Sequence, residues 1–362
     1  MRVTSGIFSD AMIEALAAAG GIRTDVPLAE GQVQPASMDL RLGRRCWRVR
    51  ASFLPGPGRQ ALARIAGLTL HEIDLSEGAV LETGCVYVAE VLESLALPSD
   101  VAASANPKSS TGRLDVFTRV IVDGGTAFDT IPAGYTGPLY AEISPKTFPV
   151  LVRAGSRLAQ VRFRRGAPRL DDGELAGLNE REQLVSGARH PIAGGVAVSV
   201  DLAGFDASGL IGYRGKRHTG LVDVDRVGAC RVADFWEPLT ADGRGALVLD
   251  PSEFYILASK EAVHVPPDYA AEMVAIDPMV GEFRVHYAGF FDPGFGHSAA
   301  GGSGSRAVLE VRSHNVPFII EDGQIVGRLV YERMAERPAR LYGSDLNSNY
   351  QAQGLKLSKH FR

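Results

Sequence analysis

One constant spacing of 168 residues relates two stretches of this chain to two later stretches. The segment AEISPKTFPVLVRAGSRLAQVRF at 141–163 aligns without a gap with LEVRSHNVPFIIEDGQIVGRLVY at 309–331. Upstream, YVAEVLESLALPSDVAA aligns with YILASKEAVHVPPDYAA at the same spacing, and SMDL at 37–40 resembles SVDL at 199–202 at a slightly different one. Unrelated strands would rarely show one spacing twice. We therefore predict two copies of one structural unit.

Each copy is predicted to be mainly β. Short runs such as VYVAEVL, PVLVRAG and GRLVYERM alternate with Gly, Pro and Asp, as expected for strands joined by turns. The clearest helix signal is SDAMIEALAAAGG near residue 10, with Ser9 or Asp10 as its cap. We expect two tandem jelly-roll or β-barrel domains with a few short helices, at 1–170 and 193–362, joined by a polar linker at 171–192.

Composition excludes several classes of protein. The formal net charge of -4 provides no overall positive field for nucleic acid or an anionic membrane surface. No apolar run approaches the roughly 18 residues that a membrane span needs. The three cysteines are isolated and odd in number, which argues against a disulfide framework and for a reducing compartment. We expect a cytoplasmic protein with no nucleic-acid or membrane partner.

Familiar catalytic and metal-binding motifs are missing from the chain. A zinc site that activates water needs a Cys-x-x-Cys pair with a further His or Cys, and three isolated cysteines cannot supply it. The sequence also lacks a GxxxxGK[ST] loop and a Gly-x-Ser-x-Gly elbow. We expect no zinc.

The segment PKSSTGRL at 107–114 is the strongest candidate for ligand binding. Two adjacent hydroxyls, a glycine and the cations Lys108 and Arg113 form a dense set of donors, which suits a triphosphate. A polar turn that closes a strand is the alternative. At the 168-residue spacing, Ser109, Ser110 and Arg113 align with Asp277, Pro278 and Gly281. A cluster kept in one copy only is expected if it serves a ligand rather than the fold.

Glu142 and Glu310 are the candidates for proton transfer, since each lies in an apolar strand run, LYAEI and VLEV. In a partly buried cleft, such a carboxylate can accept a proton from water and pass it on. An exposed strand glutamate is the plainer alternative. The glutamate recurs in both copies, which is expected either if it has a function or if the two copies simply share an ancestor.

These landmarks resemble the dCTP deaminases, within the trimeric dUTPase superfamily. QVQPASMDLRLG at 32–43 resembles the family's N-terminal signature, and KSSTGR at 108–113 resembles its substrate-binding motif. AGYTGPLYAEI at 133–143 resembles the hairpin that leads to the catalytic glutamate, and FFDPGFG at 290–296 followed by AVLEV resembles it again. NYQAQGLKLSKHF at 349–361 resembles the C-terminal lid, with Tyr350, Gln353 and Gly354 in register.

The resemblance implies a distorted jelly-roll fold and deamination at C4 of cytosine without zinc, converting dCTP to dUTP. A glutamate activates water, Ser109 and Arg113 help to hold the water, base and phosphates, and Lys108 stands where arginine is more usual. Mg²⁺ accompanies the triphosphate, and the lid excludes bulk water. Relatives are trimers that dTTP often inhibits, so a homo-oligomer is expected, with dTTP as a candidate inhibitor.

Two arrangements of the site remain open. The favoured one is a composite of both copies, made of Lys108, Ser109, Ser110, Arg113, Asp292, Glu310 and the lid at 350–354. The other uses Asp129 and Glu142 of the first copy, where the hairpin carries one extra residue after Asp129. Three other functions also remain open: a dUTP pyrophosphatase, a bifunctional enzyme that releases dUMP, and a non-catalytic nucleotide-binding module.

Overall fold

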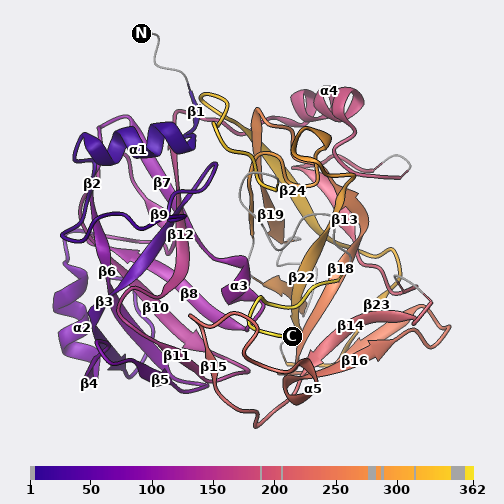
Figure 1. The fold of residues 1–362 in the computed structure, drawn as a ribbon, viewed down its shortest axis with the longest axis horizontal. Helices are drawn as coiled ribbons and strands as arrows, with labels where there is room; N and C mark the ends of the chain where they lie inside the picture. The colour runs from indigo at the N-terminus through magenta and orange to yellow at the C-terminus, as the bar shows by residue number, and fades with distance from the viewer. Residues whose placement is uncertain are drawn as a thin grey trace. The chain divides into compact units, whose positions relative to one another are not determined.

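The computed structural model describes residues 5–187, 190–204, 207–275, 283–286, 289–313, 315–343 and 355–362, with 283–286 as backbone only. The chain divides into two compact units, drawn together in Figure 1. Unit 1 comprises Met1–Ala167, His218–Cys230 and Ser358–Arg362, and unit 2 comprises Pro168–Arg217 and Arg231–Leu357. Unit 1 therefore includes two segments, 218–230 and 358–362, that come long after residue 167 in the sequence.

Unit 1 is built mainly from antiparallel strands. They are β1 (Gly6–Ile7), β2 (Ile22–Arg23), β3 (Met38–Val49), β4 (Thr69–Asp74), β5 (Ala79–Leu81), β6 (Val86–Ala96), β7 (Val101–Pro107), β8 (Val116–Val122), β9 (Thr130–Ile131), β10 (Thr136–Pro145), β11 (Val150–Val152), β12 (Arg157–Arg165) and β15 (Val222–Asp223). The main sheet runs in the order β8-β10-β6-β3-β12-β7-β9, and a smaller sheet has the order β15-β11-β5.

The two ends of the main sheet of unit 1 are tied together through Asp129. Its backbone N–H donates to the carbonyl of Val120 in β8 at 3.0 Å, and its own carbonyl accepts from Ala105 in β7 at 2.9 Å. Because β8 and β7 stand near opposite ends of the strand order, these bonds give the sheet a barrel-like closure. Strands that have no free edge avoid unwanted pairing with other chains.

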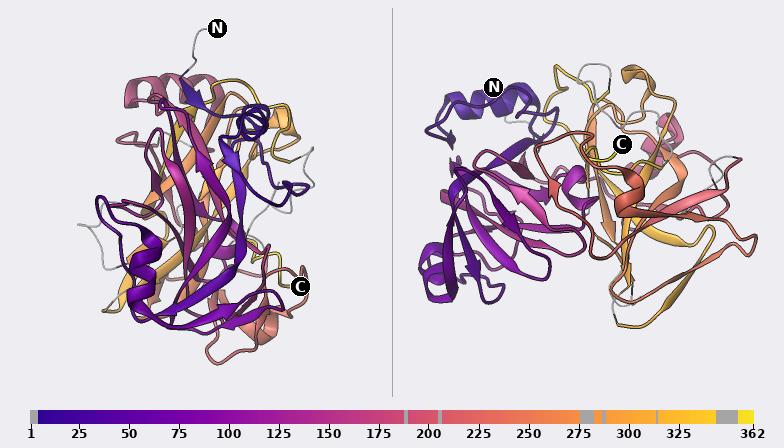
Figure 2. Two further views of the ribbon diagram at one scale, coloured as in Figure 1. Left: turned by 90° about the vertical axis from the view of Figure 1, so that its left-hand side faces the viewer. Right: turned by 60° about the horizontal axis from the view of Figure 1, so that its bottom comes forward.

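Helices cover the two ends of this sheet. Helix α1 (Asp10–Ala18) begins at Ser9, whose side chain accepts from the backbone of Met12, and it buries Ile13 and Leu16. Helix α2 (Ala61–Leu68) buries Ala61 and Ile65 against a core that includes Trp47. Figures 1 and 2 show α1 and α2 at opposite ends of unit 1. The four-residue helix α3 (Ser109–Gly112) connects β7 to β8.

Unit 2 has the same kind of architecture. Its elements are α4 (Asp172–Glu182), β13 (Val196–Ser199), β14 (Leu210–Gly215), α5 (Val232–Phe235), β16 (Trp236–Thr240), β17 (Ala246–Leu249), β18 (Phe254–Val263), β19 (Tyr269–Ala275), β20 (Phe283–His286), β21 (Phe290–Phe291), the 3₁₀ turn η2 (Ser298–Ala300), β22 (Ser305–Ser313), β23 (Phe318–Glu321) and β24 (Ile325–Arg333). Its sheets have the orders β13-β24-β19-β21, β16-β14-β18-β22-β20 and β17-β23.

The spacing of the sequence repeat reappears in the strand boundaries. Strand β12 spans 157–165 and β24 spans 325–333, while β7 spans 101–107 and β19 spans 269–275, so both bounds of each pair differ by 168 residues. The pairing is also kept, since β12 pairs with β7 and β24 pairs with β19. The expected fold class, mainly β with tandem related units and few helices, is confirmed.

The segment expected as a linker contains structure of its own. Helix α4 lies within 171–192 and begins with a capping box, in which Asp171 and Glu174 each bond the other's backbone N–H. Leu175 and Leu178 of α4 are buried in the core of unit 2. Among the described residues, no helix is both long and apolar enough to cross a membrane.

Candidate active site

The segment PKSSTGR folds as one tight turn between two strands. Lys108 precedes α3 in an extended conformation, and its carbonyl accepts from the backbone N–H groups of Thr111 and Gly112 at 2.8 and 2.9 Å. The N–H of Lys108 donates to Leu158 of β12 at 2.9 Å, which fixes the turn to the main sheet. The side chains of Ser110 and Arg113 are buried. The candidate phosphate motif is therefore a rigid part of unit 1.

Lys108 lies beside a buried carboxylate on the central strand β3. Its Nζ makes an ion pair with Oδ1 of Asp39, whose side chain is only 4% exposed. Arg157 of β12 approaches the other oxygen of Asp39 at 3.6 Å. Two cations thus share one carboxylate next to the turn. Sequence reasoning missed Asp39 and Arg157, although Asp39 belongs to the SMDL segment that marks the repeat.

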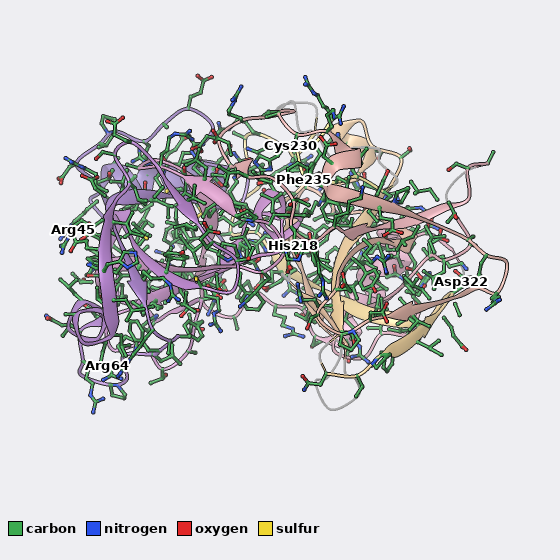
Figure 3. The ribbon with its side chains drawn as sticks, turned by 90° about the horizontal axis from the view of Figure 1, so that it is seen from below. Arg45, Arg64, His218, Cys230, Phe235 and Asp322 are labelled. Carbon is green, nitrogen blue, oxygen red and sulfur yellow. The ribbon has the colours of Figure 1, made fainter. Side chains whose placement is uncertain are left out.

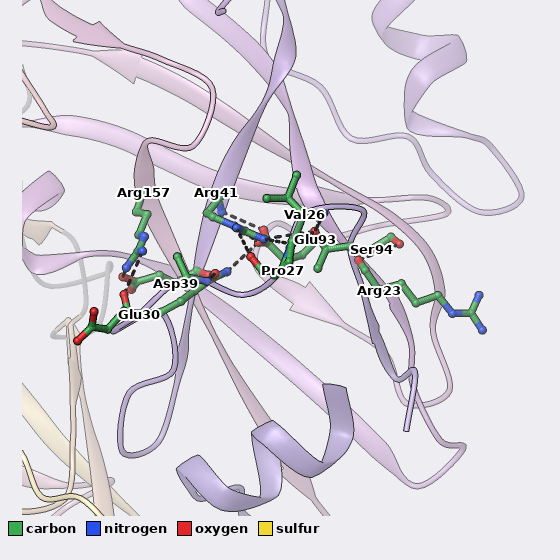
Figure 4. Close-up of polar contacts among 12 residues, drawn as sticks. Arg23, Val26, Pro27, Glu30, Asp39, Arg41, Glu93, Ser94 and Arg157 are labelled. Carbon is green, nitrogen blue, oxygen red and sulfur yellow. Dashed lines mark hydrogen bonds and ion pairs between the residues drawn. The ribbon is translucent and has the colours of Figure 1, made fainter. Parts of the chain in front are cut away.

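A buried network holds Asp39 from behind (Figure 4). Oε1 of Glu93 accepts from Nε of Arg41 at 2.7 Å and from Nε2 of Gln32 at 2.7 Å, while Oε2 accepts from the backbone N–H of Arg41 at 2.9 Å. Nε2 of Gln32 also donates to the carbonyl of Asp39 at 2.9 Å. A buried charge is tolerated when it is paired and hydrogen-bonded. The QVQPASMDLRLG segment is therefore the support on which Asp39 and Lys108 are held.

Glu142 is buried in the middle of β10, with 3% of its surface exposed. It stands opposite Arg119 of β8 and Val88 of β6 in the strand register. Its Oε1 accepts from Nε of Arg119 at 3.1 Å and also from Nη2, and the Arg119 guanidinium lies 3.7 Å from the centre of the Phe128 ring. The second oxygen, Oε2, has no hydrogen-bond partner among the described residues. An ordered water or a catalytic role is the usual explanation for a buried oxygen of this kind.

Asp129, an expected substrate-binding residue, uses one carboxylate oxygen within its own hairpin. Its backbone has φ of 59°, in the left-handed region, and Oδ1 accepts from the backbone N–H of Val120 at 2.7 Å. Aspartate is among the residues that adopt this conformation most readily, because its short side chain can bond to nearby backbone. The contacts of Asp129 therefore support the closure of the sheet.

In unit 2, Glu310 occupies the position that corresponds to Glu142. It is 6% exposed on β22, opposite Ile256 of β18 and His286 of β20 in the register. Ile256 follows Val88 by 168 residues, so the strand pairing around the two glutamates matches. The position that Arg119 takes in unit 1 is held by a histidine in unit 2.

The FFDPGFG segment folds as a tight turn around Asp292, whose side chain is 9% exposed. Gly296 has φ of 64°, and a Cβ atom there would lie 2.2 Å from the carbonyl oxygen of Val263, so only glycine fits. Phe295 packs edge-on against Phe291, with ring centres 5.0 Å apart. The lid residues Tyr350, Gln353 and Gly354 lie outside the described residues, and so do Asp277, Pro278 and Gly281.

The structure therefore groups Lys108, Asp39 and Arg157 at the α3 turn, and it pairs Glu142 with Arg119 on neighbouring strands. Asp292 and Glu310 belong to unit 2. Among the described residues, no group of three His, Cys, Asp or Glu side chains is placed to hold a metal ion.

Comparison with known proteins identifies relatives of both units. Residues 4–167 match the model of the 2'-deoxycytidine 5'-triphosphate deaminase N-terminal domain, and residues 171–361 match the C-terminal domain of the same family. A solved structure of the 2'-deoxycytidine 5'-triphosphate deaminase from Agrobacterium tumefaciens is 63% identical, with a TM-score of 0.88, over 92% of this chain and 99% of that one.

Curated relatives match over one copy's length. The dUMP-forming dCTP deaminase of Beutenbergia cavernae is 32% identical over 163 residues, which cover 43% of this chain and 78% of the relative. That of Methanoculleus marisnigri is 34% identical over 164 residues, covering 44% and 80%. The dCTP deaminase of Halorubrum lacusprofundi is 32% identical over 161 residues, covering 43% and 76%.

Proposed function

The chain belongs to the dCTP deaminase family and is an enzyme that acts on dCTP; from this premise we propose that it hydrolyses dCTP to dUTP and ammonia. The observation that carries the proposal is the α3 turn, where Lys108 is held against Asp39 beside two hydroxyls. Binding residues fixed by the fold lose little entropy when a ligand arrives.

The triphosphate binds at the α3 turn in this proposal. The ammonium of Lys108 and the hydroxyl of Ser110 donate to phosphate oxygens, because charged and hydroxyl donors suit these acceptors. Arg113, buried at the end of the turn, helps Ser109 to place the attacking water. Asp129 and Asp292 are proposed to bind the sugar or the base, and the lid at 350–354 is proposed to cover the substrate.

A glutamate activates the attacking water, and two glutamates compete for this role. Glu142 is supported by its burial and by Oε2, which accepts no hydrogen bond among the described residues. Its Oε1 is held by Arg119, so the proton would pass through Oε2. Glu310 is supported by the burial of its side chain on β22, at the position that corresponds to Glu142. A water attacks C4 of cytosine while the glutamate takes one of its protons and passes it to N3. The glutamate then moves the proton of the new C4 hydroxyl to the amino group, the C4–N bond breaks, and ammonia leaves as the carbonyl forms.

Mg²⁺ enters this proposal with the substrate. Asp39, the buried carboxylate beside Lys108, is ion-paired with Lys108 and Arg157, so it does not offer a metal site. Mg²⁺ commonly keeps several waters and binds through substrate phosphates, and here it would neutralise part of the triphosphate charge. Assembly as a homo-oligomer and inhibition by dTTP belong to the same proposal.

Release of dUMP is the second candidate function. The relatives from Beutenbergia cavernae and Methanoculleus marisnigri are both named as dUMP-forming. The more similar Agrobacterium tumefaciens protein is named as a deaminase without that addition. We therefore keep dUTP as the proposed product.

Incubation of the purified chain with dCTP and Mg²⁺ separates these functions. Ammonia and dUTP in equal amounts are expected. Ammonia with dUMP and pyrophosphate would establish the bifunctional reaction, dUTP hydrolysis without any action on dCTP would indicate a pyrophosphatase, and binding without turnover would indicate a nucleotide-binding module. Glu142→Gln and Glu310→Gln, made separately, then identify the base, whose loss should slow turnover at least about 100-fold.

A further inference from the structure

The segment Ser358–Arg362, called here the tail anchor, is a built part of unit 1. Its backbone is hydrogen-bonded to residues 228–230. The N–H of Gly228 donates to the carbonyl of Lys359 at 3.0 Å, and the N–H of Cys230 donates to the carbonyl of His360 at 3.0 Å. The ring of Phe361 contacts the ring of Phe148, with centres 6.2 Å apart. Figure 3 labels Cys230, at the end of the segment 228–230.

Two buried residues fix the tail anchor around Lys359. His360 is 2% exposed, and its Nε2 lies 2.9 Å from the carbonyl oxygen of Val224. Its Nδ1 lies 2.9 Å from Oγ of Ser358. Oγ of Ser358 also donates to the carbonyl of Ser110 at 2.7 Å. The tail anchor is therefore attached directly to the α3 turn, across 248 residues of sequence.

The electrostatic surroundings of Lys359 include the charges of the α3 turn and of Asp39. Burial lowers the pKa of Lys359 first, and the positive charge of Lys108 lowers it further, while Asp39 and Asp225 oppose this shift. Asp225 is itself engaged, since it accepts from Ser156 at 2.7 Å and lies 3.4 Å from Arg153. Lys108 and Arg157 share the buried carboxylate of Asp39, and Lys359 directly follows Ser358, whose hydroxyl is bonded to the α3 turn. Cations that are held close together repel one another, and an anion placed among them removes this cost.

We propose that Lys359 binds the polyphosphate of the substrate together with Lys108, and that Ser358 and His360 hold it in that place. The inference rests on the proposed function and names a further residue of the same site. A multiply charged phosphate chain fits because it neutralises several cations at once. A lysine whose two neighbours are anchored loses little backbone freedom on binding.

The test compares three variants of the full chain with the wild type. Lys359→Gln should raise KM for dCTP about 10- to 100-fold, the range for a lost hydrogen bond to a charged group, and leave kcat within about threefold. Lys359→Arg should stay within about threefold of the wild type in KM. Arg64→Gln, on the exposed face of α2 (Figure 3), removes the same charge elsewhere and should leave both constants unchanged.

Salt and a phosphate probe provide further readouts. Inorganic triphosphate should compete with dCTP, and Lys359→Gln should weaken its inhibition by a similar factor. Raising the ionic strength should raise the wild-type KM more steeply than that of Lys359→Gln, because one screened contact is already absent.

An unchanged KM in Lys359→Gln would overturn the proposal. So would a fall in kcat alone, which indicates a structural role, or a defect that Lys359→Arg does not rescue. If the wild type has no activity on dCTP, it is the proposed function that fails. Binding of inorganic triphosphate to wild type and Lys359→Gln would still test Lys359 in that case.

Discussion

Replacing Glu93 with Gln should destabilise unit 1 strongly. Glu93 accepts three hydrogen bonds, two from Arg41 and one from Gln32, and the side chains of Glu93 and Arg41 are 0% and 6% exposed. A glutamine there presents an NH₂ group to at least one of these donors. It also leaves the Arg41 guanidinium buried without its counter-charge.

The burial of this pair sets the expected loss in free energy of unfolding. Removing one partner of a buried ion pair typically costs about 3 to 5 kcal/mol, because the remaining charge stays desolvated. For a unit of this size, each kcal/mol lowers Tm by about 2 to 4 °C, so a decrease of about 6 to 20 °C is expected. Gln32 also holds the backbone of Asp39, so KM for dCTP should rise as well.

The tryptophans provide the assay. The sequence contains two, with Trp47 buried in unit 1 and Trp236 buried in unit 2. In a Trp236→Phe background, fluorescence reports the unfolding of unit 1 alone. In a Trp47→Phe background it reports unit 2, so the two backgrounds separate the loss in unit 1 from any change in unit 2.

A surface pair that includes a residue of β3, the strand that carries Arg41, serves as the control. Arg44 lies 3.2 Å from Asp74, and the side chains are 70% and 62% exposed. Exposed pairs contribute about 0 to 1 kcal/mol, so Arg44→Gln should lower Tm by no more than a few degrees. If Glu93→Gln costs no more than Arg44→Gln, the reasoning from burial is refuted.

Three other predictions concern the site and the tail anchor. Ser109→Ala should lower kcat at least about 100-fold with KM for dCTP within about fivefold, if its hydroxyl places the water; a change in KM alone would assign Ser109 to substrate binding. Arg119→Gln should lower kcat more than tenfold if Glu142 is the base, and steady-state kinetics that show no change would favour Glu310. Burial lowers the pKa of His360 from 6.5 in the folded protein. As the pH falls, the unfolded chain therefore takes up a proton before the folded protein does. The stability that His360 contributes is present above about pH 6.5 and is lost below it. Trp47 fluorescence melts at pH 8 and pH 5.5 should differ more in the wild type than in His360→Gln, and equal differences would contradict this assignment.

Local patterns in the sequence were sufficient for the repeat and for much of the secondary structure. The 168-residue spacing anticipated that β12 and β24 occupy equivalent places, since a strand's alternation and turn residues survive duplication. The cap of α1 could be predicted as well, because a capping side chain bonds to backbone only a few residues away. Helix α4 was missed, because its polar composition predicted a linker, although its cap residues Asp171 and Glu174 stand in the sequence.

The contacts that build the site depend on tertiary structure. Asp39 meets Lys108 from 69 residues away, and Ser358 meets Ser110 from 248 residues away. No periodicity encodes such pairs, because each partner resembles an ordinary strand or turn residue in its own neighbourhood. The partner of Glu142 is nearer, since Arg119 is 23 residues away, but choosing it required the register of β8 against β10.

The division of unit 1 among three separate parts of the chain has a consequence for synthesis and for cloning. Strand β15 and the tail anchor belong to unit 1, yet the ribosome reaches residue 358 about 10 to 40 s after residue 167 at ordinary elongation rates. Unit 1 cannot complete its fold until these later segments have been translated. A gene cut between the copies would accordingly not yield two autonomous proteins, because the first product would lack β15, the residues that cover Phe148 and the hydroxyl that secures Ser110.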